Sequence, residues 1–439
     1  MSLRTRKICV CAALALFLLL KLFLNSRQIP ANFPVSSIPY QFGAYASSLL
    51  DHGDYADCTS VPCIRASRMP VLPWVLAALG RLSRSARTVA FLKNILVSVL
   101  TAAVLLWFVD IHARLFPGSG AAWLLLLPLA LAPPFARHAS SIFYEEGLLA
   151  EFLVSWSLLF MAGVVVWAKR DRAEGAPVVL ACLLFATVIY LTKDSMLFVL
   201  LGSLALGALW TVRFREPRTL AALVLSLAAL LAWGVHNQVD SGRFSISTSF
   251  DGENLYRGFN QQSYEIYPYV NLDEVLRAPH QVDLVDGKSY VIGIPELGFG
   301  NEWEWNDYYK RLAVSWVESD PPTAIDFTLK KISNFFFSLY LNPFEGGLNR
   351  TFADLIHAWL IFGRLMQLEL AAMLAALWLR KNAWSKALVA GVLVVNLAYA
   401  APYLVCYNYE RHINVYLALV ATSLFMVCSA LLDMRSLKS

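Results

Sequence analysis

This 439-residue chain contains about ten apolar stretches that are long enough to cross a bilayer. A membrane span needs about 20 mostly apolar residues. Only 15% of the residues are charged, whereas soluble domains average about 25%, so these stretches predict transmembrane helices. We therefore expect an all-α polytopic membrane protein. The stretches lie at roughly 8–24, 88–109, 121–138, 148–168, 177–192, 195–212, 219–236, 354–379, 387–406 and 413–432.

Basic clusters predict the orientation of these spans. With ten spans counted, the clusters that follow alternate spans lie on the same side as the basic N-terminus. The positive-inside rule assigns that side to the cytoplasm, together with both termini. A further cluster, Arg81, Arg84 and Arg87, falls on the outer side, but it follows a long loop, where the rule is weak. The agreeing clusters are Lys169/Arg170/Arg172, Arg213/Arg215/Arg218, Arg380/Lys381/Lys386 and Arg435/Lys438.

The first apolar run, Ile8–Leu24, follows basic residues as a signal peptide would. No small-residue cleavage site follows it, so we expect a retained first span. The three predicted units are residues 1–236, a transmembrane bundle with a first outer loop at 25–87; residues 237–353, a second outer loop; and residues 354–439, the C-terminal transmembrane helices.

Each outer loop carries an expected structural element. In the first loop, Pro70–Leu82 is apolar but too short to span and predicts an interfacial helix. In the second loop, Phe244, Ile246 and Thr248 alternate with serines, which predicts a strand and hence a small α+β element.

Two of the seven cysteines, Cys58 and Cys63, lie in the polar first loop. In an oxidising compartment they form either a small disulfide or two free thiols, and the sequence leaves both alternatives open.

Polar side chains gather at the outer ends of the predicted spans, and buried or interfacial charges in membranes usually have a function. Each of them also has a simpler reading. Arginines and lysines can extend to lipid headgroups, two adjacent glutamates can form a solvated loop pair, and a histidine can end a helix. Nevertheless, arginine matches phosphate oxygens, and a carboxylate beside it can take a proton from an acceptor hydroxyl. The gathered residues are Arg68, Glu145, Glu146, Lys193, Asp194, His236, Asn237, Arg411 and His412.

At these residues the chain resembles the membrane glycosyltransferases of the GT-C superfamily, particularly the protein O-mannosyltransferase and aminoarabinose-transferase-like branch. Its motifs occur in the family's order over nearly the whole chain. They are HGDY (52–55) with Arg68-Met69-Pro70, YEEG (144–147), LTKDS (191–195), HNQVDSGRFSISTSFDGENLYRGFN (236–260), NEWEWNDYYKRLAVSWVESDPP (301–322) and NYERHINVYLAL (408–419).

The resemblance implies a polyprenyl-phosphate-sugar donor and inversion at the anomeric carbon. It implies that Arg68 and Arg411 hold the lipid phosphate, with Lys193 as a further candidate. We expect Glu146, His236 and Asn237 to contact substrate.

In the family an acidic residue of the first loop is assigned as the catalytic base. The chain departs from the family here, because Ile38 stands at that position. The substitute base is open: Glu145 comes first, then Asp51 and Asp54. A non-catalytic relative is the remaining alternative.

The predicted function is a glycosyltransferase that moves a sugar from a lipid phosphate to a glycan, lipid or protein acceptor, in a bacterial inner membrane with the site facing the periplasm. The alternatives are a glycan ligase or polymerase that uses a diphosphate-lipid donor, and a transporter of lipid-linked saccharides. We expect no required cofactor or metal, although Glu145 with Glu146 is a conceivable divalent-cation site. Membrane lipids are the expected surroundings, and nucleic acid is not an expected partner.

Overall fold

The computed structural model describes residues 1–59, 63–130, 132–284, 287–294, 298–338, 350–380, 382–406 and 409–436. Within these ranges nine helices are long and apolar enough to cross a membrane, or ten if a bent pair counts as one span. The chain is thus an all-α polytopic protein, as predicted. The nine helices are α1 (Leu3–Gln28), α4 (Ala86–Leu115), α7 (Glu146–Lys169), α8 (Arg172–Thr192), α9 (Leu197–Phe214), α10 (Pro217–Ser241), α15 (Arg350–Trp378), α16 (Ala383–Val405) and α17 (Glu410–Ser436).

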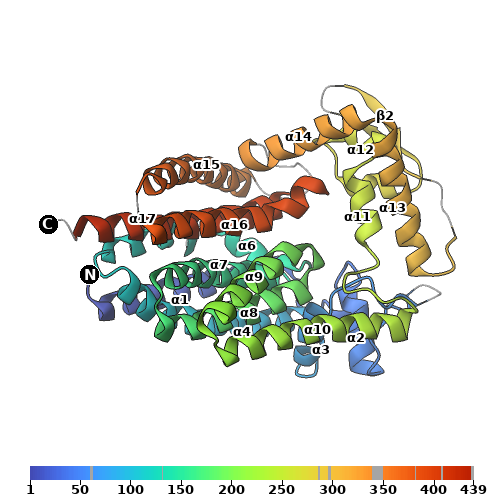
Figure 1. Ribbon diagram of the computed structural model, residues 1–439. Coiled ribbons are helices and arrows are strands. Elements are labelled where there is room, and N and C mark those ends of the chain that lie inside the picture. Colours follow the sequence, from blue (N-terminus) through green and yellow to red (C-terminus); the bar gives the residue numbers. More distant parts are fainter. Residues whose placement is uncertain are drawn as a thin grey trace.

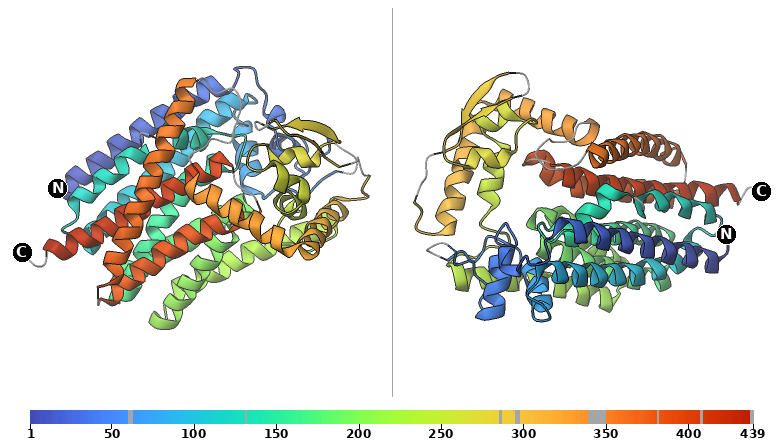
Figure 2. Two further views of the ribbon diagram at one scale, coloured as in Figure 1. Left: turned by 90° about the horizontal axis from the view of Figure 1, so that it is seen from above. Right: turned by 180° about the vertical axis from the view of Figure 1, so that it is seen from behind.

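Helix α7 is the centre of the bundle and is the most deeply buried of the nine candidate spans. It packs against α4, α8, α16 and α17. The two termini lie together at one end of the bundle, and the two loop regions lie at the other end (Figures 1 and 2). We call the latter the loop end. This arrangement fits an even number of crossings.

The predicted span 121–138 is broken in two. Its first part is a 3₁₀ turn, η2 (Gly120–Leu126), continued by α5 (Leu127–Ala130), and its second part is α6 (Pro133–Ser140). The two parts are bent by 66°. Prolines explain the break, because Pro128 lacks an N–H group and Pro133–Pro134 favour the first turn of a new helix.

The first loop region folds against the end of α4 through η1 (Val35–Ser37), α2 (Phe42–Asp51) and α3 (Val71–Gly80). The last of these confirms the predicted short helix at Pro70–Leu82. Two of the basic residues that disagreed with the orientation rule bind this region: Arg87 Nε donates to Ile29 O at 2.6 Å, and Arg84 pairs with Asp51 at 2.9 Å. Contacts within the first loop region therefore account for Arg84 and Arg87 lying on the side opposite to the other basic clusters.

The second loop region contains five short or medium helical elements and a two-stranded antiparallel sheet. The predicted small α+β element is present, but the strand predicted at residues 244–249 is wrong. There the carbonyls of Ser245 and Ser247 accept hydrogen bonds from Asn237, and the carbonyl of Ile246 accepts one from Tyr190, so side chains replace a partner strand. The elements are α11 (Asp251–Gly258), α12 (Gln261–Ile266), η4 (Leu272–Leu276), β1 (His280–Asp283), β2 (Ser289–Ile292), α13 (Glu302–Ser319) and α14 (Pro321–Phe337).

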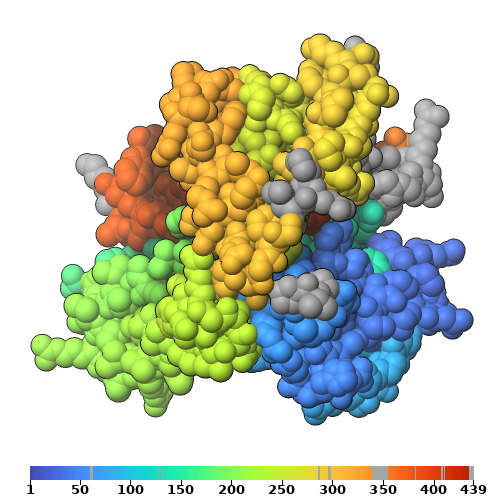
Figure 3. All heavy atoms as spheres, turned by 90° about the vertical axis from the view of Figure 1, so that its right-hand side faces the viewer, coloured from blue at the N-terminus to red at the C-terminus, as the bar shows by residue number. Residues whose placement is uncertain are grey.

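Figure 3 views the loop end, where the yellow and orange residues of the second loop region lie above the blue first loop region and the green end of α10. Glu302 of the second loop region contacts the first loop region. Its carboxylate accepts hydrogen bonds from the backbone N–H groups of Arg65 and Ala66. The second loop region is thereby held over the first.

Candidate active site

A cavity of about 120 Å³ lies at the loop end of the bundle. Its wall comes from segments far apart in the sequence, at residues 40–69, 144–145, 193–195, 248–273 and 402–412. The lining residues are Tyr40, Phe42, Ser67, Arg68, Met69, Tyr144, Glu145, Lys193, Asp194, Ser195, Thr248, Phe250, Asn254, Arg257, Asp273, Pro402, Tyr403, Cys406, Arg411 and His412. The structure thus brings together Arg68, Glu145, Lys193 and Arg411, all of which the sequence singled out.

Glu146 lies behind this wall and organises its cations. The side chain is 2% exposed and sits in the first turn of α7, where the helix dipole favours a negative charge. It forms ion pairs with Lys193 and with Arg411 Nε at 3.6 Å, and its Oε1 lies 3.1 Å from His412 Nε2. Glu146 does not line the cavity but holds Lys193 and Arg411 from behind its wall, and its contact with substrate stays a prediction.

The charge of Lys193 is preserved by its surroundings. Burial lowers the pKa of its ammonium group, but the Glu146 carboxylate, with Tyr403 and Glu145, outweighs burial and holds this pKa above its usual value. Lys193 therefore presents a positive charge to the cavity at neutral pH.

Aromatic rings set the orientation of the two arginines. The guanidinium of Arg68 lies 4.5 Å from the ring centre of Phe250 and 5.1 Å from that of Phe42, and its Nε donates to Tyr40 O at 3.0 Å. The guanidinium of Arg411 lies 4.5 Å from the ring centre of Tyr144. A stacked guanidinium loses little further freedom when it binds an anion, so both planar groups are suited to binding phosphate oxygens.

Glu145 lies between two of these cations. Its carboxylate oxygens are 3.9 Å from Arg68 Nη1 and 4.0 Å from Lys193 Nζ, which are electrostatic contacts longer than hydrogen bonds. The side chain is 16% exposed and faces the cavity. An anion that enters the cavity would compete directly with Glu145 for these two cations.

A buried lysine fixes the turn that carries both glutamates. Lys93, in α4, donates to the carbonyls of Ala139 (3.1 Å), Ser141 (2.8 Å) and Gly147 (2.7 Å). At residue 147 only glycine fits, because a Cβ atom there would lie 1.8 Å from Ser141 O. Lys93 was not among the predicted site residues, although a charge within an apolar run was itself a signal.

Besides Glu146, four predicted site residues do not join the cavity wall. Asp51 pairs with Arg84 on the surface, and Asp54 pairs with Arg65 at 2.6 Å. His236 lies 2.7 Å from Asp240 and stacks on Trp233. Asn237 is buried and donates a hydrogen bond to Ser245 O.

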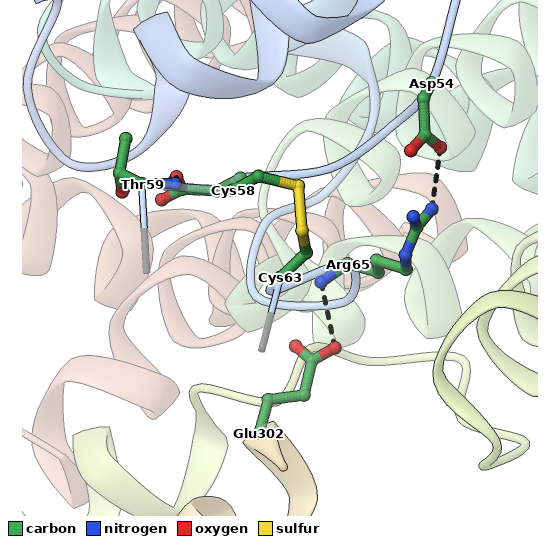
Figure 4. The surroundings of a disulfide bond; sticks show 7 residues. Asp54, Cys58, Thr59, Cys63, Arg65 and Glu302 are labelled. Carbon is green, nitrogen blue, oxygen red and sulfur yellow. Dashed lines mark hydrogen bonds and ion pairs between the residues drawn. A yellow bond between two sulfur atoms is a disulfide. The ribbon is translucent and has the colours of Figure 1, made fainter. Parts of the chain in front are cut away.

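The first loop also contains the two cysteines in question, and they are joined in a disulfide (Figure 4). Of the two alternatives that the sequence left open, the structure has the bonded pair. The bridge ends at Cys63, two residues before Arg65, whose backbone is held by Glu302 and whose side chain binds Asp54 (Figure 4). These contacts of Arg65 lie three residues before Arg68 in the chain.

The geometry offers poor support for a metal at Glu145 and Glu146, because both carboxylates already face cations. Among the residues that the structure describes, no group of three or more His, Cys, Asp or Glu side chains is arranged to hold a metal ion. The expectation that no metal is required stays a prediction.

Part of the cavity wall was not anticipated from the sequence. Arg257 pairs with Glu253 and, through Nε, with Asp273 at 3.0 Å, and both Arg257 and Asp273 line the cavity. The i, i+4 spacing of Glu253 and Arg257 was a detectable sign of an ion pair on one helix face. The position of Asp273 had no such sign.

The chain matches no family model, no curated protein and no solved structure. Function is therefore inferred from the cavity.

Proposed function

We propose that the chain is a membrane glycosyltransferase that moves a sugar from a polyprenyl-phosphate donor to an acceptor hydroxyl, with inversion at the anomeric carbon. The observation that carries the proposal is the cavity in which Arg68, Lys193 and Arg411 converge at the ends of the candidate spans. Three cations in one small cavity suit an anionic group, and arginine suits phosphate in particular.

The position of the cavity favours a lipid phosphate over a soluble one. Lys193 directly follows the end of α8, Glu145 directly precedes α7, and Arg411 lies in the first turn of α17. If these helices cross the bilayer, their ends lie at headgroup level, where the phosphate of a polyprenyl lipid also lies.

Arg68 has the donors that such a ligand needs. Its Nε is used by Tyr40 O, while in the described part of the chain its two Nη groups have only the long contact with Glu145. A phosphate oxygen can therefore accept hydrogen bonds from Arg68 without breaking a short protein contact. We propose that Arg68, Lys193 and Arg411 stabilise the phosphate as it leaves the anomeric carbon.

The reaction also needs a carboxylate that takes the proton of the acceptor hydroxyl. Three carboxylates line the cavity: Glu145, Asp194 and Asp273. The proposal is therefore chemically complete with residues of this chain alone.

The test is turnover by the purified protein in liposomes with a panel of radiolabelled polyprenyl-phosphate sugars and with glycan, lipid and peptide acceptors. Transfer of label to an acceptor, with release of polyprenyl phosphate, supports the proposal. Activity with diphosphate-linked donors alone would assign the chain to the ligases or polymerases, and transport of the donor across sealed vesicles without a covalent product would assign it to the transporters.

A further inference from the structure

The three carboxylates that line the cavity differ in their surroundings. Glu145 lies 3.9 and 4.0 Å from two cations, and Asp273 is paired with Arg257 at 3.0 Å. For Asp194, no cation of the described residues lies within 4.0 Å. Glu145 and Asp273 are therefore already engaged by cations of the cavity wall, and Asp194 is the lining carboxylate that is not.

Neutral donors hold Asp194 in place. Its Oδ2 accepts from Thr248 Oγ1 at 2.6 Å and from Ser247 Oγ at 3.1 Å, and its Oδ1 accepts from the backbone N–H of Ser195 at 2.8 Å. These bonds fix the rotamer of the carboxylate at the cavity wall. A general base needs this fixed orientation toward the hydroxyl that it deprotonates.

The local backbone separates Asp194 from the cations. Lys193 has an extended conformation (φ −151°, ψ 115°), and consecutive side chains of an extended backbone point to opposite sides. Accordingly, Lys193 reaches Glu146, whereas Asp194 reaches the segment of Ser247 and Thr248. Inverting displacement requires the nucleophile and the leaving group on opposite faces of the sugar. Lys193 provides a cation for the leaving phosphate, and Asp194 provides a carboxylate for the attacking hydroxyl.

Resting on the proposed glycosyl transfer, we propose that Asp194 is the general base of the reaction, in place of Glu145, which the sequence favoured. The carboxylate of Asp194 takes the proton as the acceptor O–H bond breaks. The acceptor oxygen forms the new bond to the anomeric carbon, and the bond from that carbon to the phosphate oxygen breaks with its electron pair left on the phosphate.

A second carboxyl group supports Asp194 from behind. The Ser247 hydroxyl lies 3.1 Å from Asp194 Oδ2 and 2.7 Å from Asp251 Oδ2, so it bridges the two side chains. Although part of the Asp251 side chain reaches solvent, crowding of its carboxyl by protein atoms, and next the charge of Asp194, raise the pKa of Asp251 well above its usual value. The shared Ser247 hydroxyl and the effect of Asp194 on Asp251 thus mark the two carboxyl groups as one interacting pair.

Titratable groups of several neighbouring elements interact electrostatically with this pair. They are Tyr190 of α8, Lys310 of α13 and Cys406 after α16. Lys310 opposes the effect of Asp194 on Asp251. Asp251 does not line the cavity, so removing it tests the support of Asp194 without touching a residue of the cavity wall.

The decisive experiment measures two quantities for each variant: binding of sugar-free polyprenyl phosphate and turnover of the donor that the panel identifies. For Asp194→Asn we expect unchanged binding and a kcat lower by about 10²- to 10⁴-fold, the usual contribution of a general base. Asp194→Glu should recover part of the activity. Asp326→Asn, an exposed Asp paired with Lys330 in α14, is the matched control and should turn over at the wild-type rate.

The pH profile separates a base from a merely structural residue. Asp194→Asn should remove the acidic limb of kcat/KM, because an asparagine side chain does not titrate, whereas Asp251→Asn should keep an acidic limb. An Asp194→Asn variant that binds lipid phosphate and keeps at least half of the wild-type kcat would overturn the assignment, as would an acidic limb that persists unchanged in Asp194→Asn. If the wild-type protein turns over no donor, the proposed function itself fails.

Discussion

Replacing Arg68 with alanine should weaken the binding of polyprenyl phosphate. The guanidinium is only 17% exposed, stacks on Phe250 and has two Nη groups for a phosphate oxygen. A hydrogen bond that involves a charged group is worth about 1.5–3 kcal/mol, which corresponds to a dissociation constant raised about 10- to 150-fold. The upper part of this range is expected, because the same change leaves Glu145 with one cation fewer to offset its repulsion of the phosphate.

The assay is titration of detergent-solubilised protein with sugar-free polyprenyl phosphate. Arg68→Lys should lie between wild type and alanine, because the ammonium keeps the charge but loses the stacked, planar donor group. Arg84→Ala is the matched control, since Arg84 lies at the same end of the molecule and pairs with Asp51 on the surface. Equal affinities of the Arg68→Ala and Arg84→Ala variants would refute the assignment of Arg68 to the phosphate site.

Three further changes test the supports of the cavity. Lys93→Met should speed amide exchange across residues 141–147 and lower kcat, because three carbonyls lose their donor; an unchanged exchange pattern would show that Lys93 does not fix the turn. Cys58→Ser with Cys63→Ser should make the first loop more sensitive to protease, since closing so short a loop contributes about 2 kcal/mol; equal cleavage rates would contradict this. Asp51→Asn should leave kcat unchanged, and a large loss would return Asp51 to the candidates for the base.

The spans were the most predictable part of the fold. Nine of the ten predicted stretches lie within single helices of the described chain apart from a residue or two at their ends, because length and hydropathy decide whether a segment can cross a bilayer. The exception, 121–138, contains Pro128, Pro133 and Pro134. Its apolar composition predicts a span, whereas its prolines break the helix.

The strand predicted at 244–249 shows the limit of a pattern of alternating residues. Alternation describes which way side chains point, but a strand also needs a partner to bond its backbone. Here Asn237 and Tyr190 bond the carbonyls instead, and those two residues come from separate helices. A long-range contact of this kind leaves no local trace in the sequence.

The sequence singled out the main cations of the candidate site, but it did not show which carboxylates face the cavity. Arg68, Lys193 and Arg411 were found because charges at the ends of apolar spans are conspicuous. Asp51 and Asp54 were weighed as bases because they lie on the same loop as Arg68, yet each is bound by a nearby arginine away from the cavity. Proximity in sequence does not give the direction of a side chain in an irregular loop.

The most direct test of a lipid-phosphate site is an experimental structure of the protein with polyprenyl phosphate bound. We predict the phosphate in the cavity at the loop end, within hydrogen-bond distance of Arg68, Lys193 and Arg411, with Glu145 displaced from its two cations. A phosphate bound at the other end of the bundle, or in this cavity without contact to any of the three cations, would contradict the proposed function.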